Sequence, residues 1–475
     1  MDQEKGLLGS RRSSVGAILG STVHHGFRGL LHAMIRWPSV PSGDQLRPTA
    51  WLDGLRGFAA FLVYFHHNQA WAHLHHSQNQ WFENAWGFNG EYWLSAFHGI
   101  RMFFSGGHYA VATFFVISGY VLSTSILRKI HRGDYDGLAR NLSSALFRRW
   151  IRLFLPVLGT TFLWMTSWHA LGWCVRPFIK QENYAAELAK WFSEVKNYMF
   201  IYDKNPFPWL YWNLHTWSIP FEFRGSLAIY TVTLGLASAT KTARIFCSLA
   251  LMFYFMCMVE AWYLSFFLAG MLICDLDLMA EANDLPRPLE AFRQKVKPYK
   301  VAFYTGCLVV SVLLGGVPLA NDNFEQFKTE PLWGYIAFLK PAPLKQHKWF
   351  YLFWAAILLV ISVPRIPWLK AFFKSRFCQY LGRVSYSLYL VHGPLIWTVG
   401  NIVYQVVGFE KDGENDSFWN LLPLPKGGPM GFEPAFWIAQ LVVMPATFWV
   451  ANIVTVTMDE PSVRLAKWAF DQTKA

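Results

Sequence analysis

Trp51-Leu-Asp-Gly-Leu-Arg-Gly-Phe-Ala-Ala-Phe-Leu-Val-Tyr-Phe-His-His-Asn68 is a stretch of mostly apolar residues that also contains ionisable side chains. A transmembrane helix needs about 20 mostly apolar residues, and this stretch, extended to residue 74, has that length. Ionisable groups inside such a helix are costly and are functional candidates by default. The stretch therefore predicts a membrane-spanning helix that carries part of a polar site.

The composition of the whole chain agrees with a membrane protein. Of 475 residues, 53% are hydrophobic and 15% are charged, against about 45–50% and about 25% in soluble domains. A soluble globule with so few charges, and with 24 Trp and 41 Phe, has too little polar surface to cover itself. Composition thus excludes a nucleic-acid-binding domain, a disordered protein and an ordinary cytosolic enzyme.

The distribution of apolar segments and basic residues predicts the topology. If the N-terminus is cytoplasmic, the inner segments hold 28 of the 42 Lys and Arg residues, as the positive-inside rule expects. We therefore predict an all-α polytopic membrane bundle of about ten transmembrane helices, with both termini in the cytoplasm. The ten segments are residues 54–74, 102–127, 153–172, 213–238, 245–259, 262–278, 301–320, 349–364, 384–405 and 434–456.

The chain divides into one membrane domain and two tails. We predict a basic cytoplasmic tail over residues 1–50, a membrane domain over residues 51–460 and a short cytoplasmic tail over residues 461–475. The outer loops 73–100 and 173–212 are rich in Trp, Phe and His, and are expected to lie on the bilayer or to cap a cavity. The protein is expected in the endoplasmic reticulum, the Golgi or the plasma membrane.

Two Asn-X-Ser sequences and six cysteines complete the survey of simple motifs. In the predicted topology Asn415 lies in an outer loop, where it could be glycosylated, and Asn141 faces the cytosol and stays unmodified. The cysteines are scattered through apolar segments and predict no disulfide framework. Because no His/Cys cluster has metal-ligand spacing, the sequence predicts no metal site.

Helical geometry places three ionisable residues of the first span on one face. At 100° per residue, Arg56 and His67 differ by about 20°, and they lie about 16 Å apart along the axis. Asp53 lies about 60° from Arg56, whereas His66 lies about 80° away on the other side. Asp53, Arg56 and His67 thus line one polar stripe. His67 is either a water-bound histidine at an interface or a general base for a hydroxyl proton.

Further polar residues lie in later segments, and each has a structural alternative. Ser118 belongs to a small-residue pair that also favours close helix packing. Arg149 and Arg152 share a helical face at the membrane edge, where they act as topology anchors or bind phosphates. Glu222 is an acid in an apolar segment and needs a partner. Pro220 precedes it and is expected to kink that span.

Five sequence blocks follow one another along the chain: LDGLRGFAA with Arg56 and the later His67, FFVISGY, RRWIRLFLP, HTWSIPFEF and YSLYLVH. Together they resemble the acyltransferase 3 family of integral membrane acyltransferases, in a fungal form. The match covers roughly residues 50–400, although Ile-Pro stands in the fourth block where the family tends to have Leu-Ala. The family's usual ten-helix core agrees with the number of segments found here.

The resemblance implies transfer of an acyl group, commonly acetyl from acetyl-CoA, to a hydroxyl group. It assigns His67 as the catalytic histidine and Arg56 as its motif partner, and it associates Arg149 and Arg152 with acyl-CoA. No bound cofactor is implied, because acyl-CoA is a co-substrate, and the other partners are a hydroxyl-bearing acceptor and membrane lipid. The supporting residues of the matching blocks are Ser118, Trp217, Glu222, Tyr389 and His392.

Two other functions are compatible with charges inside the membrane. A proton-coupled transporter or flippase would use them as a proton relay, and a scaffold or export partner would need no buried histidine. The shared face of Arg56 and His67 favours the enzyme, and no inverted repeat supports the transporter. The acceptor stays open between a small lipophilic metabolite and a glycan.

Overall fold

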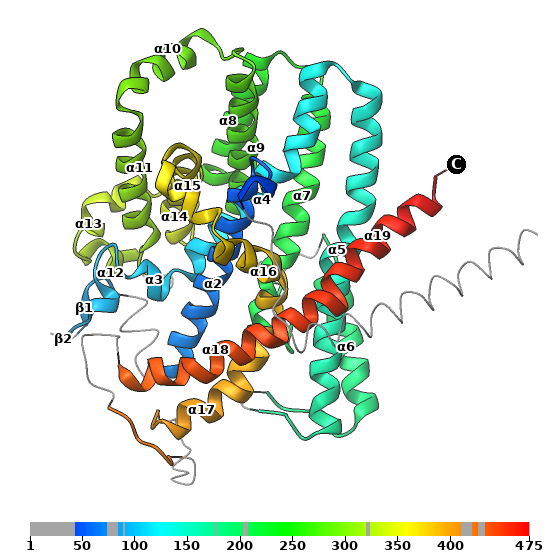
Figure 1. Ribbon diagram of the computed structural model, residues 1–475, viewed down its shortest axis with the longest axis vertical. Helices are drawn as coiled ribbons and strands as arrows, with labels where there is room; N and C mark the ends of the chain where they lie inside the picture. Colours follow the sequence, from blue (N-terminus) through cyan, green and yellow to red (C-terminus); the bar gives the residue numbers. More distant parts are fainter. Residues whose placement is uncertain are drawn as a thin grey trace, which may run out of the picture.

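The structure of the protein is a computed structural model that describes eight segments of the chain (Figure 1). Most of the predicted N-terminal tail and Asn415 lie outside these residues. Within them the fold is helical, apart from a short antiparallel hairpin of β1 (Gly87–Phe88) and β2 (Glu91–Tyr92). The described residues are 43–73, 84–88, 91–175, 178–202, 208–319, 324–409, 420–425 and 433–474.

Each of the ten predicted apolar segments coincides with a helix or a pair of consecutive helices. The helices up to residue 281 are α2 (Ala50–Ala72), α3 (Met102–Ser105), α4 (Gly107–Arg132), α5 (Tyr135–Ala170), α6 (Tyr184–Tyr198), α7 (Ser218–Gly235), α8 (Lys241–Cys257) and α9 (Trp262–Glu281). The later ones are α10 (Arg287–Val296), α11 (Lys300–Gly315), α12 (Phe324–Thr329), α13 (Trp333–Ile336), α14 (Lys348–Ser362), α15 (Pro367–Phe373), α16 (Arg376–Leu395), α17 (Asn401–Val406), α18 (Pro434–Val454) and α19 (Glu460–Gln472).

The helical class is confirmed, whereas the number of membrane crossings stays a prediction. By length and hydropathy, five helical stretches of the described residues qualify as spans. The helices α2, α5, α7 and α16 are not among them, which agrees with the polar residues they carry. The five stretches are Gly107–Arg132, Trp262–Glu281, Arg287–Gly315, Lys348–Arg365 and Pro434–Gln472.

The segments that connect the helices lie at the two ends of the bundle, as expected if successive spans cross the membrane in opposite directions. Figure 1 shows α10, from a predicted inner segment, at one end of the molecule and α6 and α17, next to predicted outer loops, at the other. Which end faces the cytoplasm stays a prediction based on the Lys and Arg distribution.

Several segments that were predicted to lie outside the spans are helical, among them α6 in the loop 173–212. Residues 128–152 were expected to form an inner loop, but α4 continues to Arg132 and α5 begins at Tyr135. A single left-handed glycine, Gly133, ends α4, and Asp134 caps α5 by accepting a hydrogen bond from the Gly137 amide at 2.8 Å. The predicted C-terminal tail likewise forms α19, which packs on α5.

Glycines let the helices around the site approach closely. A side chain at Gly57 in α2 would lie 2.1 Å from the Gly382 nitrogen in α16, so these backbones touch. A side chain at Gly119 in α4 would lie 1.9 Å from the Phe267 carbonyl oxygen in α9. The small-residue packing expected beside Ser118 is therefore present, and it fixes α4 against α9.

Candidate active site

A charged cavity of about 220 Å³ lies among α2, α4, α5, α7 and α16. Arginines in its lining outnumber acids by four to two, so the cavity favours anions. We call it the basic cavity. Its charged residues are Arg56, Arg149, Arg152, Arg383, Glu222 and Asp459, and its hydroxyl groups come from Ser118, Ser218, Ser385, Tyr386 and Tyr389.

Glu222 has the partner that its apolar surroundings require. The Arg149 guanidinium donates to the Glu222 carboxylate and, at 2.8 Å, to Ser226 Oγ. The expected kink at Pro220 is absent, because Pro220 lies in the first turn of α7, where backbone N–H groups have no helical acceptor. Glu222 therefore stays on the helix face that meets α5, and Arg149 is held in place rather than free.

Arg152 differs from Arg149 in having no such anchor. It lines the same cavity and is accessible to solvent. Among the described residues it forms no ion pair and no side-chain hydrogen bond, although Asp459 lies close enough to interact electrostatically. The guanidinium of Arg152 is thus available to an anionic ligand, whereas that of Arg149 is already bonded.

The two charged residues at the start of α2 have different surroundings. Arg56 lines the basic cavity, where it donates to the Gly382 carbonyl at 3.0 Å and lies 3.8 Å from the Asp53 carboxylate. Asp53 instead accepts from Arg47 at 2.5 Å and is not part of the cavity lining. Asp53 therefore acts on Arg56 rather than on a ligand in this cavity.

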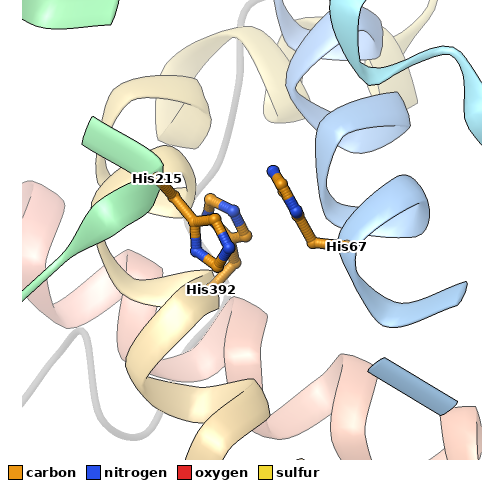
Figure 2. Close-up of side chains that lie close together, drawn as sticks. All are labelled: His67, His215 and His392. Carbon is orange, nitrogen blue, oxygen red and sulfur yellow. The ribbon is translucent and has the colours of Figure 1, made fainter. Parts of the chain in front are cut away.

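Three histidines from distant parts of the chain form a cluster, which we call the histidine cluster. Figure 2 shows His67 on α2, His215 on the turn before α7 and His392 on α16 with their rings turned toward one another. Ring centroids lie 3.9 Å apart for His67 and His215, 5.2 Å for His67 and His392, and 4.8 Å for His215 and His392. One ring nitrogen of each lies within 4.8 Å of the others, so these residues could hold a metal ion.

Hydrogen bonds fix the turn that carries His215 against α16. Asn213 donates from Nδ2 to the Leu390 carbonyl at 2.8 Å. The Tyr389 hydroxyl donates to the His215 carbonyl and lies 2.7 Å from Ser218 Oγ. Because these bonds span about 170 positions of sequence, the histidine cluster depends on the tertiary fold.

The two adjacent histidines of α2 have different neighbours, although their ring centroids lie only 4.9 Å apart. The His67 ring faces His215 and His392, whereas the His66 ring packs against Gly107 in α4 and lies 6.0 Å from the His108 ring. A side chain at Gly107 would lie 2.7 Å from His66 Cδ2, so His66 fills a tight space. The rotation that the helix geometry predicted for the two rings is thus present in the fold.

A second cavity, of about 660 Å³, lies among α5, α16, α17 and α18 and is lined mainly by apolar side chains. Its polar, uncharged residues are Thr160, Thr161, Ser167, Asn213, Thr398 and Asn401. None of its lining residues is charged. Leu163, Trp173 and Ile402 in its lining are exposed on the outside of the bundle, so the cavity reaches that surface. We call it the apolar cavity. Its aromatic residues are Trp164, Trp173, Trp212 and Trp397.

The histidine cluster lies between the two cavities and lines neither. On one side Tyr389, which lines the basic cavity, is bonded to the His215 carbonyl. On the other side Trp397, which lines the apolar cavity, stacks on the His215 ring at 5.1 Å. Leu390 and Val391 of the apolar cavity adjoin His392 in sequence. Ligands in the two cavities would therefore approach the cluster from different sides.

Most of the residues singled out from the sequence meet in this region. Ser118, Glu222 and Tyr389 line the basic cavity together with the three arginines of the sequence motifs. Trp217 lies apart from the cavity, packed among aromatic rings with Trp349 at 6.0 Å. Sequence reasoning missed His215, Arg383 and Asp459. His215 stood in the quoted HTWSIPFEF block, whereas Arg383 and Asp459 carry no motif that could have identified them.

Comparisons with known proteins point to one family. Residues 49–456 match the acyltransferase 3 family, described as an acyltransferase domain. The chain is 30% identical to O-acetyltransferase PaAT-1 of Phomopsis amygdali over 461 residues, which covers 90% of this chain and 86% of that protein. It is 24% identical to acyltransferase clz18 of Cochliobolus lunatus over 343 residues, or 64% and 71% of the two chains. No solved structure matches.

These matches confirm the resemblance found in the five sequence blocks. The family match spans α2 to α18 and includes the histidine cluster and the lining of both cavities except Met458 and Asp459. The similar proteins are fungal, as expected from the sequence. The chain is a fungal member of the acyltransferase 3 family of membrane acyltransferases.

Proposed function

We propose that the chain is an integral membrane O-acyltransferase that moves an acyl group from acyl-CoA to a hydroxyl group, with His67 as the general base. The acyl group is expected to be acetyl, and the acceptor is a small lipophilic metabolite or a glycan. The observation that carries the proposal is the position of the histidine cluster between a basic and an apolar cavity.

The charged lining of the basic cavity suits the phosphate groups of the donor, and its volume of about 220 Å³ holds only part of an acyl-CoA molecule. Acyl-CoA carries phosphates, and a guanidinium binds phosphate through two parallel hydrogen bonds. Arg152 is the unanchored guanidinium of this cavity, and Arg56 and Arg383 add positive charge. In the predicted topology this side of the bundle faces the cytosol, where acyl-CoA is available. The name of the similar Phomopsis amygdali protein, an O-acetyltransferase, supports acetyl as the group transferred.

The apolar cavity suits a lipophilic acceptor better than a glycan. Its volume of about 660 Å³ falls within the range of small-molecule sites. A glycan would need many hydrogen-bonding partners, whereas this lining is largely aromatic and aliphatic and has no charge. The exposed Leu163 and Ile402 at its edge offer a lipid-dissolved molecule a lateral entrance. We therefore favour a small lipophilic alcohol.

The proposed chemistry needs no further reagent. His67 takes the proton from the acceptor hydroxyl while its oxygen attacks the thioester carbonyl carbon. The carbon–sulfur bond then breaks, and the imidazolium returns the proton to the leaving thiolate. The products are an ester and free CoA, so atoms and charges balance. Binding both substrates next to the histidine cluster would raise the rate, because the reacting groups are then held close together and in the right orientation.

Two measurements test the proposal. The purified protein in lipid nanodiscs should release free CoA from acetyl-CoA only when an acceptor alcohol is present, and mass spectrometry should find the acetylated alcohol. Transport of the alcohol or of protons without CoA release would instead identify a transporter. Comparative mass spectrometry of metabolites and glycans from a deletion strain should show which class loses an acyl increment and thereby identify the acceptor.

A further inference from the structure

We infer that His67, His215 and His392 form a site for one transition-metal ion, Zn²⁺ in the first instance, and that the bound ion inhibits acyl transfer. The inhibition rests on the proposed function, because it requires His67 to be the base. The metal site itself rests on the geometry of the cluster alone. No sequence motif predicts this site, because 148 and 177 positions separate the successive histidines.

The distances are close to those of a three-histidine metal site. One ring nitrogen of each histidine lies within 4.8 Å of the others. Tetrahedral zinc with Zn–N bonds of about 2.0–2.1 Å places its nitrogens about 3.3–3.4 Å apart. The rings are now partly stacked, with interplanar angles of 23° to 39°. Because the χ2 torsion of histidine is broad, ring rotation alone closes much of this difference.

The hydrogen bond of His392 leaves its other ring nitrogen available to a metal ion. Its Nδ1 lies 3.1 Å from the Leu388 carbonyl oxygen, which accepts only if Nδ1 carries the proton. The lone pair of His392 is then on Nε2, which is buried and has no hydrogen-bond partner. Metal-ligating histidines commonly donate their other N–H to a backbone carbonyl in this way. Nδ1 of His215 is also buried without a partner.

The scaffold holds the three ligands on packed helices. The contact of Gly57 with Gly382 fixes α2 against α16, and the bonds of Asn213 and Tyr389 fix His215 against α16. In the described part of the chain none of the three histidines forms an ion pair with an acid. Three imidazoles without a carboxylate are a ligand set that suits zinc and its neighbouring transition metals.

A metal at this site would compete with catalysis. The lone pair of His67 cannot bind an ion and accept a hydroxyl proton at the same time. The metal-free enzyme is therefore the active form, and zinc should inhibit it reversibly. His66 is the matched control, since it neighbours His67 but packs against Gly107, outside the cluster.

Metal binding is measured first, without substrates. The full-length protein in detergent is stripped with a chelator and titrated with Co²⁺. Wild type should bind one ion with the visible absorption of tetrahedral cobalt, and Zn²⁺ should displace it. His392→Gln should weaken cobalt binding at least about tenfold, because losing a metal ligand lowers the affinity by more than losing a residue that only hydrogen-bonds to a ligand. His66→Gln should leave cobalt binding unchanged. Cobalt binding that is unaltered in His392→Gln overturns the site.

Inhibition is measured next, on acetyl-CoA turnover. Zinc should inhibit the metal-free wild type, and a chelator should restore its activity. In His392→Gln, judged against its own metal-free rate, half-inhibition should need at least about tenfold more zinc. A metal-free enzyme that is inactive and gains activity with zinc overturns the inhibition. A further outcome is that His67→Ala retains full turnover while cobalt still binds the wild-type cluster. This would refute His67 as the general base and, with it, the inhibition by zinc, but it would leave the metal site supported.

Discussion

The basic cavity and the apolar cavity lie on opposite sides of the same three histidines, but they are built from different residues. Six charged residues line the first, and none lines the second. In the first, an ion pair holds Arg149 and a backbone carbonyl holds Arg56, whereas Arg152 has no such anchor. The second is lined by tryptophans and aliphatic side chains, and its edge is exposed on the outside of the bundle.

This difference indicates how one membrane protein joins two unlike molecules. A highly charged donor needs a pocket whose fixed charges replace its water, and a lipophilic acceptor needs one that excludes water. Helices α5 and α16 contribute to both cavities, so a change in either helix can affect both substrates. Single lining residues should nevertheless affect one substrate at a time, and this separation is what the following variants test.

The largest effect is expected at the junction of the two cavities. His67→Ala should lower the rate of transfer about 10²–10⁴-fold, as loss of a general base typically does. His67→Gln should fail as well, because an amide does not accept and return a proton at neutral pH. His66→Ala should retain substantial activity. CoA release by equal amounts of inserted protein provides the measurement, and near-full turnover of His67→Ala would refute the catalytic assignment.

The next largest effect is expected on stability, in the basic cavity. Arg149→Ala leaves the partly buried Glu222 carboxylate without its cation, and breaking the pair should cost up to about 3–5 kcal/mol, the cost for a fully buried pair. Adding Glu222→Gln should recover much of the loss, because the unpaired charge is gone. Thermal unfolding in detergent measures both variants. An unaltered unfolding temperature in Arg149→Ala would mean that the ion pair does not hold this cavity together.

Arg152 should affect the donor alone. Arg152→Ala should raise the donor KM by the equivalent of about 1.5–3 kcal/mol, the value of a charge-assisted hydrogen bond. Arg152→Lys should restore only part, because lysine lacks the bidentate geometry. Arg148→Ala is the matched control, since Arg148 neighbours the cavity residues on α5 but does not line it. A rise in the acceptor KM instead would reverse the assignment of the two cavities.

Thr398 offers the corresponding test of the acceptor. Thr398→Trp adds a large ring to the apolar cavity and should raise the acceptor KM about tenfold or more, on the scale of steric discrimination in apolar pockets. The donor KM should stay constant. Leu441→Trp adds the same ring to an exposed position of α18 outside the cavity and should alter neither. Equal effects from both tryptophans would argue against an acceptor site here.

The smallest effect is expected on the stability of α5, one of the two helices that line both cavities. Lys129 donates a hydrogen bond to Asp134 and, together with the Gly137 amide, lowers the pKa of this N-cap of α5. Its charged form therefore adds stability that is present above the ordinary pKa of about 4 and is lost as the pH falls through the lowered value.

Unfolding temperatures across this acid range provide the test of Asp134. Asp134→Asn keeps a cap acceptor but should remove this contribution to the pH dependence, whereas Asp136→Asn, in the same turn, should keep it. Neither variant should alter the donor or the acceptor KM at neutral pH. A changed KM would show that a change in the stability of α5 is enough to alter substrate binding. The KM changes in the cavity variants could then not be assigned to the loss of a direct contact.

The sequence predicted the helices and much of the basic cavity because these depend on local or repeated patterns. Apolar segments of sufficient length identified the helices, and helix periodicity placed Arg56 and His67 on one face and turned His66 away. The predicted kink at Pro220 was wrong, because the sequence alone does not show where the helix begins, and the first turn tolerates proline.

The rest depends on contacts between residues far apart in the chain. His215 meets His67 and His392 only because Asn213 and Tyr389 attach its turn to α16. The apolar cavity is formed by common apolar residues whose types do not distinguish a pocket from a packed core. Arg383 of α16 and Asp459 of the segment Thr455–Asp459, which follows α18, enter the basic cavity through tertiary packing, so no local motif identifies them.

The most direct measurement is an electron cryomicroscopy structure of the inactive His67→Ala variant with acetyl-CoA and the acceptor identified by mass spectrometry. The account predicts phosphate density against Arg152 in the basic cavity, the acceptor in the apolar cavity, and the acetyl group beside position 67 with the acceptor hydroxyl next to it. Acetyl-CoA in the apolar cavity, or an acetyl group remote from the histidine cluster, would contradict the account.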